Sequence, residues 1–109
     1  MNHYEYTQSV LRTARTDLNK EKQLQNILLG IAGESGEILD CFKKQLFQDH
    51  PQDKSKIMNE VGDVLFYLYW LAENQGFTIE DCMAANKAKL EKRYPVTFSP
   101  TLSLNREKE

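Results

Sequence analysis

Residues 64–71 form an uninterrupted run of apolar and aromatic side chains, Val64-Leu65-Phe66-Tyr67-Leu68-Tyr69-Trp70-Leu71. The run lies in a segment from Asp53 to Asn74 that we predict to be one helix, because Gly76 follows as a typical C-terminal stop. A helix that is apolar on nearly every side has to be covered on most of them. Either a second subunit covers it or the other helices of a monomer surround it. Because a chain of 109 residues buries limited surface by itself, we expect oligomerisation through this third helix.

Three further segments have helical patterns, so the predicted fold is all-α. The first two run over about Tyr4–Ala14 and Lys22–Leu46. The third begins after an N-cap at Thr78 and ends at about Arg93. The dipeptides typical of β-hairpins, Asn-Gly and Asp-Gly, are missing. The sequence predicts one domain over residues 1–98, followed by a flexible tail over residues 99–109.

The composition is that of a folded, soluble domain, with 40% hydrophobic residues, 28% charged residues and 5 glycines. No apolar run reaches the roughly 18 residues of a membrane span, and the N-terminus lacks the pattern of a signal peptide. We therefore expect a cytoplasmic protein with no membrane partner. The net charge of −2 offers no basic face, so nucleic acid is not an expected partner either.

The cysteines and histidines have no spacing that indicates a site. Cys41 and Cys82 lie in apolar patterns without a Cys-x-x-Cys step, and we expect two buried free thiols rather than a disulfide or a zinc site. His3 and His50 match no metal or catalytic spacing and are expected at the surface.

Two pairs of carboxylates interrupt apolar helix faces. Glu34 and Glu37 form a Glu-x-x-Glu step in the second helix, and Glu60 and Asp63 form a Glu-x-x-Asp step in the third. Residues three apart on a helix are surface neighbours, so each step directs two carboxylates the same way. Four ionised carboxylates beside a core are unfavourable unless cations neutralise them. Such an all-oxygen pocket suits Mg²⁺, with Mn²⁺ as a substitute; the alternative is two solvated helix faces.

The fourth helix carries charge of the opposite sign. Asn86, Lys89 and Arg93 are spaced three and four apart and share one face. A cationic strip opposite a metal-filled acidic pocket would suit a polyphosphate. The alternative is a solvated basic face near a helix C-terminus, which the helix dipole favours.

Glycines lie beside the acids inside the predicted helices, where each costs about 1 kcal/mol relative to alanine. They are Gly30, Gly33, Gly36 and Gly62. This placement indicates close approach of the helices, room for a ligand, or both.

Three stretches occur in order: Gly30-Ile-Ala-Gly-Glu-Ser-Gly-Glu-Ile38, Asn59-Glu-Val-Gly-Asp-Val-Leu-Phe-Tyr67 and Asn86-Lys-Ala-Lys-Leu-Glu-Lys-Arg-Tyr-Pro95. Together they resemble the MazG-like nucleoside triphosphate pyrophosphohydrolases of the all-α NTP pyrophosphatase superfamily. The similarity covers roughly residues 4–98. It implies a four-helix bundle of the MazG-like type that assembles as a dimer or as a dimer of dimers.

The resemblance also implies roles for individual residues. Mg²⁺ would be bound by Glu34, Glu37, Glu60 and Asp63, and the triphosphate by Asn86, Lys89, Arg93 and Tyr94. Of the four acids, we predict Glu37 as the general base of the reaction. Many members have a further acid directly before the first motif acid. This chain has Gly33 there, so four metal ligands are expected rather than five.

These residues predict Mg²⁺-dependent hydrolysis of a nucleoside triphosphate to the monophosphate and pyrophosphate. The resemblance implies a house-cleaning role against non-canonical nucleotides. Two alternatives stay open. One is a selective dUTP, dCTP or phosphoribosyl-ATP pyrophosphatase of the same superfamily, and the other is a catalytically weak helical module that binds a partner protein.

Overall fold

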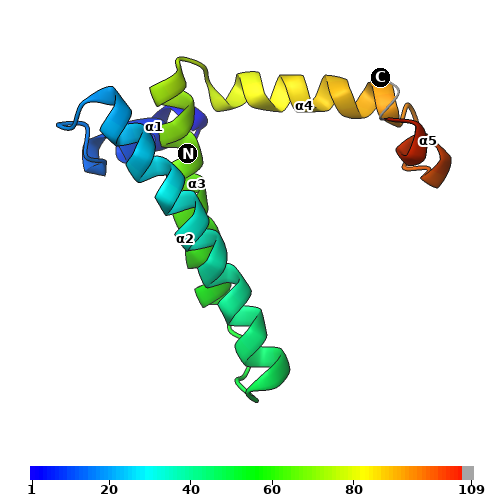
Figure 1. Cartoon of the computed structure of the whole chain (residues 1–109), viewed down its shortest axis with the longest axis horizontal. Coiled ribbons are helices and arrows are strands. Elements are labelled where there is room, and N and C mark those ends of the chain that lie inside the picture. The colour runs from blue at the N-terminus through cyan, green and yellow to red at the C-terminus, as the bar shows by residue number, and fades with distance from the viewer. Residues whose placement is uncertain (107–109) are drawn as a thin grey trace. The chain divides into compact units, whose positions relative to one another are not determined.

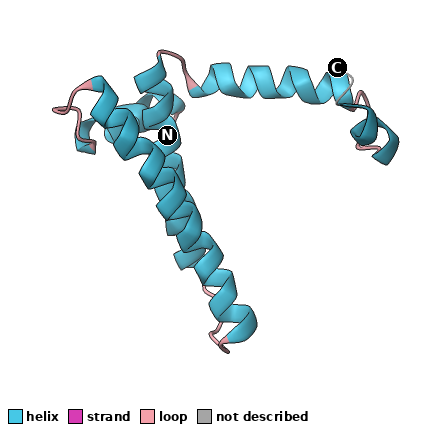
Figure 2. Cartoon of the chain, in the orientation of Figure 1, coloured by secondary structure: helices cyan, strands magenta, loops and turns pink. Residues whose placement is uncertain are grey.

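The computed structural model describes residues 1–106, and these contain helices and loops but no strand (Figure 2). The helices are α1 (His3–Thr13), α2 (Lys20–Phe47), α3 (Lys54–Gln75), α4 (Ile79–Arg93) and α5 (Pro100–Asn105). The all-α prediction is confirmed for this part of the chain, and the first four helices match the predicted segments closely. None of the described helices combines the length and the apolarity that a membrane crossing requires.

Local sequence determines where the helices begin and end. Asn19 and Asp53 cap α2 and α3 by accepting hydrogen bonds from backbone N–H groups three residues further on. Thr78 and Asp81 form the capping box expected at the start of α4. Helix α3 ends at Gly76, whose φ of 83° is the left-handed conformation that favours glycine.

The chain divides into two compact units, one over Met1–Gly76 and one from Phe77 onward. In the first unit α2 and α3 pack side by side as an antiparallel pair, and α1 packs on α3 (Figure 1). In the second unit, α4 buries none of its side chains. The assembly of the helices into a four-helix bundle stays a prediction.

The predicted tail over residues 99–109 contains the short helix α5. Residues 107–109 lie outside the described residues. The flexibility of this segment, and the domain boundary at residue 98, stay predictions.

The centre of the first unit is formed by Val10, Ile27 and Trp70, which come from α1, α2 and α3 respectively. Trp70 is only 2% exposed, and its indole Nε1 donates a hydrogen bond to Oε1 of Gln23 at 3.1 Å. The Gln23 amide nitrogen donates in turn to the carbonyl of Leu18 at 2.7 Å, in the connection between α1 and α2. These contacts hold three helices and one connection together.

Two expectations about individual side chains are corrected by the fold. Cys41 is buried and Cys82 is exposed, and both are free. The prediction of two buried thiols is therefore wrong for Cys82, because α4 buries none of its residues. His50 is exposed as expected, whereas His3 is half-buried because it packs on Tyr69.

Gly30 allows the close approach of α2 and α3. A Cβ atom at this position would overlap the ring of Tyr67. That ring cannot easily yield, because it lies edge-on to Phe66 at 5.1 Å between centroids and stacks on Trp70 at 6.3 Å. At Gly30 the structure thus supports the interpretation of the helical glycines as sites of close packing.

Gly30→Ala is expected to lower the free energy of unfolding by about 1–3 kcal/mol, the usual cost of overpacking, in a denaturant titration. Gly36→Ala in the same helix is the matched control, because a Cβ there meets nothing within 4 Å. This control should keep the stability or raise it by up to about 1 kcal/mol. Equal effects of the two substitutions would show that Tyr67 does not restrict Gly30.

Candidate functional site

Three of the four predicted carboxylates converge between α2 and α3. Glu34, Glu60 and Asp63 each offer a carboxylate oxygen, and these oxygens all lie within 4.8 Å of one another. Glu34 and Glu60 are half-buried, and Asp63 is exposed. The contact between Gly30 and Tyr67 lies one helical turn away, four residues before Glu34 and four after Asp63. It brings the two helices close enough for their acids to meet. We call these three residues the carboxylate group.

The pKa of the Glu34 carboxyl reflects its burial and the negative charges that surround it in the carboxylate group. Its pKa is raised above the ordinary value, first by burial and then by the negative charges of Asp63, Glu60 and Glu37, with a hydrogen bond to Glu60 as a smaller cause. The folded chain therefore favours a positive charge at this point. A hard divalent cation with oxygen ligands fits such a donor set.

Glu37 lies one turn beyond Glu34 on α2 and is exposed. It is outside the carboxylate group, although its charge contributes to the raised pKa of Glu34. Its assignment as a metal ligand and as the general base stays a prediction.

The predicted phosphate-binding residues all belong to the second unit. Asn86 and Lys89 are exposed on α4, and Arg93 at its C-terminal end is half-buried. Tyr94 caps the helix, and its ring lies 5.2 Å from that of Phe98. Their assignment to the triphosphate stays a prediction.

A pocket of about 570 Å³ lies one helical turn from the carboxylate group, and the sequence analysis did not identify it. Its lining combines an aromatic ring, two amides, an ammonium group and apolar side chains, from Leu18, Lys22, Gln25, Asn26, Leu29, Gly30 and Tyr67. We call it the Tyr67 pocket. One signal was present in the sequence, because Tyr67 follows Asp63 by four residues and must share its helix face.

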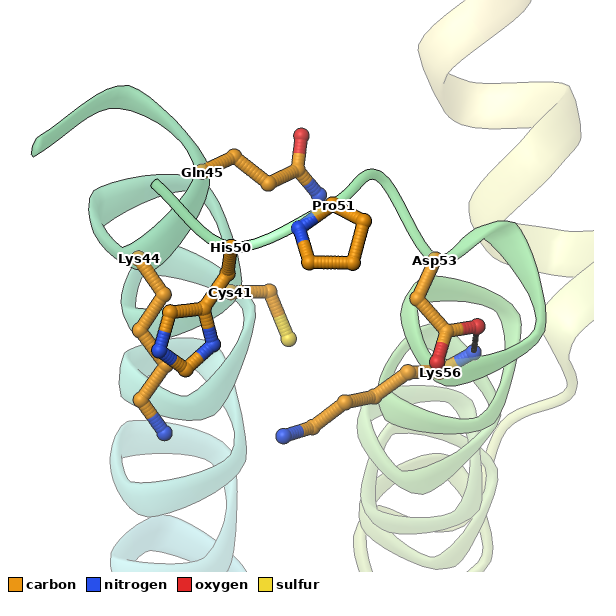
Figure 3. Close-up of a pocket in the computed structure, with 7 residues that line it drawn as sticks. All are labelled: Cys41, Lys44, Gln45, His50, Pro51, Asp53 and Lys56. Carbon is orange, nitrogen blue, oxygen red and sulfur yellow. Dashed lines mark hydrogen bonds between the residues drawn. The ribbon is translucent and has the colours of Figure 1, made fainter. Parts of the chain in front are cut away.

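A smaller pocket of about 180 Å³ lies at the turn between α2 and α3, where Figure 3 shows the Cys41 thiol facing Lys56. Two of its charged side chains, Lys44 and Asp53, have partners. Lys44 Nζ lies 3.0 Å from a carboxylate oxygen of Asp40, and Asp53 accepts a hydrogen bond from the backbone N–H of Lys56 at 3.1 Å. The first contact lies within α2 and the second caps α3, and neither assigns chemistry to the pocket.

The fold and the carboxylate group define an all-helical domain with an acidic site between two antiparallel helices. The chain belongs to the MazG nucleotide pyrophosphohydrolase domain family, whose model matches residues 22–98.

Two relatives are similar over most of this chain. It is 26% identical over 92 residues to dCTP pyrophosphatase 1 of Bos taurus and 29% identical over 94 residues to that of Rattus norvegicus. Each match covers 79% of this chain and 54% of the relative. The chain thus spans about half the length of the curated relatives it matches. No solved structure matches it significantly.

Millimolar Mg²⁺ is expected to raise the Tm of the wild-type chain by roughly 5 °C, because a cation that binds only the folded state stabilises it by mass action. Glu34→Gln should abolish this shift. It should also raise the Tm of the metal-free chain at neutral pH, since it removes a carboxylate whose ionisation its surroundings disfavour.

The matched control is Glu73→Gln, which removes an exposed carboxylate of α3 outside the carboxylate group. It should keep the Mg²⁺-dependent shift. A wild-type Tm that does not change between metal-free buffer and Mg²⁺ would contradict a metal site at the carboxylate group.

Proposed function

We propose that this chain is a Mg²⁺-dependent pyrophosphohydrolase that cleaves a nucleoside triphosphate between its α- and β-phosphates, giving the monophosphate and pyrophosphate. The observation that carries the proposal is the convergence of three carboxylate oxygens within 4.8 Å of one another. Membership of the MazG nucleotide pyrophosphohydrolase family supports it. The matched relatives are named as dCTP pyrophosphatases, so a deoxynucleoside triphosphate heads the substrate candidates.

Four acidic side chains would bind the cation, and one of them would also act as general base. Glu34, Glu60 and Asp63 would hold the cation, with Glu37 as the fourth ligand. When bound, Mg²⁺ neutralises phosphate oxygens and lowers the pKa of a coordinated water. Glu37 would also accept the proton of the attacking water as general base, a role open to an exposed carboxylate next to the cation.

The face of α4 would bind the rest of the triphosphate. Asn86, Lys89 and Arg93 offer an amide, an ammonium and a guanidinium group along one side of the helix, and Tyr94 follows them. Charged donors of this kind bind phosphate oxygens strongly and stabilise the charge that grows on departing pyrophosphate.

The Tyr67 pocket would receive the nucleobase. Its aromatic ring offers a stacking surface, and the amides of Gln25 and Asn26 offer donors and acceptors for the edge of a base. The pocket adjoins the carboxylate group, as the base of a nucleotide must adjoin its phosphates. Preference for dCTP, dUTP or a damaged nucleotide, and with it a house-cleaning role, would be decided there.

Release of pyrophosphate from a panel of canonical and damaged nucleoside triphosphates and phosphoribosyl-ATP tests the proposal. Lys89→Ala should lower kcat/KM on the best substrate by about 10²-fold, as the loss of one charge-stabilising donor does. Lys92→Ala, off the proposed face, is the control and should keep the wild-type rate.

No pyrophosphate from any compound of the panel, with either Mg²⁺ or Mn²⁺, would favour the partner-binding module instead. A full rate in Lys89→Ala would contradict only the role of the α4 face.

We further propose that a second copy of this chain covers the α2–α3 pair. Large apolar side chains are exposed along both helices, among them Leu28, Leu29, Leu39, Phe42, Leu46, Met58, Val61, Leu65 and Leu68. Monomeric proteins seldom leave so many apolar groups exposed on one pair of elements. The active protein would then be a dimer or a dimer of dimers.

Light scattering at micromolar concentration should report at least a dimer for the wild-type chain. Leu68→Glu should shift the mass toward the monomer, because it places a charge in the proposed interface on α3. Gln8→Glu adds the same charge at an exposed position of α1 and should leave the mass unchanged. A monomeric mass for the folded wild type would refute the interface.

A further inference from the structure

Helix α1 contacts α3 through a cluster of three ring side chains, His3, Tyr6 and Tyr69. The rings of Tyr6 and Tyr69 meet edge to face, with centroids 4.8 Å apart. The His3 ring stacks on Tyr69 at 6.0 Å, and its Nδ1 lies 2.7 Å from the Tyr69 hydroxyl. With Leu65 these side chains line a pocket of about 570 Å³. The cluster fixes the orientation of the Tyr6 ring.

The Tyr6 side chain reaches the backbone of α3 beside the carboxylate group. Its hydroxyl donates a hydrogen bond of 3.5 Å to the carbonyl oxygen of Gly62, the residue directly before Asp63. A carbonyl has two lone pairs and can accept this bond in addition to its helical one. Tyr6 and Gly62 are 56 residues apart in the sequence. The contact therefore joins α1 to the part of α3 that carries Asp63, one of the three acids.

The surroundings of Tyr6 keep its hydroxyl available as a donor. Partial burial, then Tyr69, and then the charge of Asp63 raise the pKa of Tyr6 above its ordinary value. A tyrosine hydroxyl is protonated at neutral pH even at its ordinary pKa of about 10, so Tyr6 can donate.

We propose that Tyr6 is a positioning residue, whose hydrogen bond to the Gly62 carbonyl orients the Asp63 step of α3 and so determines how tightly the carboxylate group holds a divalent cation. The inference rests on the proposed function of that group as a metal site. Cation affinity depends on the placement of each ligand, and the loss of a hydrogen bond made directly to a ligand typically costs 10–100-fold in affinity. The Tyr6 contact acts on the residue next to Asp63, so we expect an effect at the lower end of this range. Asp63 is the exposed member of the three, so its placement depends most on its backbone.

Calorimetric titration of the full chain with Mn²⁺, without nucleotide, measures this role directly. Tyr6→Phe removes the hydroxyl and keeps the ring packing, so its metal-free Tm should stay within a few degrees of wild type. Its Kd for Mn²⁺ should rise by about tenfold. Tyr4→Phe removes a hydroxyl from the same helix at a side chain that is 72% exposed, and it should bind Mn²⁺ like the wild type.

The rate of pyrophosphate release separates positioning from general damage. At saturating metal Tyr6→Phe should recover the wild-type kcat, because only the affinity for the cation is lowered. A kcat that stays low at saturating metal would contradict a positioning role. Should Tyr6→Phe unfold, Tyr69→Leu provides the second variant, because it removes the ring against which Tyr6 packs edge to face. Its Kd for Mn²⁺ should rise as well, and an unchanged Kd would overturn the inference.

The outcomes distinguish this inference from the proposed function. A wild-type chain that binds no Mn²⁺ refutes the metal site, and the role of Tyr6 with it. A wild-type chain that binds Mn²⁺ while Tyr6→Phe binds it equally tightly overturns the positioning role alone.

Discussion

The burial of Trp70 against Val10 and Ile27 is the contact on which the rest of the first unit depends. One large ring contributes more buried surface than any other side chain type and joins three helices at once. Its indole N–H is satisfied by Gln23, which also binds the α1–α2 connection, so burial leaves no polar group unpaired. This centre therefore positions α1 on α3 and helps to set the register between α2 and α3.

The register between α2 and α3 determines where the carboxylate group forms. Tyr67, one turn before Trp70 on α3, packs across Gly30, and the two helices approach closely enough there for acids of both to meet one turn further on. Burial first, and then the negative charges of Asp63, Glu60 and Glu37, raise the pKa of Glu34. The fold thus accepts an unfavourable arrangement of negative charge that a bound cation would relieve, as is usual at functional sites.

The second unit is stabilised differently. Helix α4 is specified by its own sequence, through the capping box at Thr78 and basic residues in its last turn. An exposed pair between Lys87 and Glu91 adds little. None of its side chains is fully buried, and Asn86 and Lys89 are exposed. The binding of phosphate by this face stays a proposal.

The sequence alone predicted the first four helices, the cap at Thr78, the stop at Gly76 and the two acid steps, because these depend on residues within about four positions of each other. It could not tell that Glu34 meets Glu60 and Asp63 while Glu37 lies outside their group. Nor could it place Tyr6 against the carbonyl of Gly62, or show which glycine lies under an aromatic ring. Those relations join residues far apart in the chain, and their geometry depends on how the helices pack. Local patterns therefore determined the elements and the chemical groups, whereas only tertiary packing decided which of those groups meet.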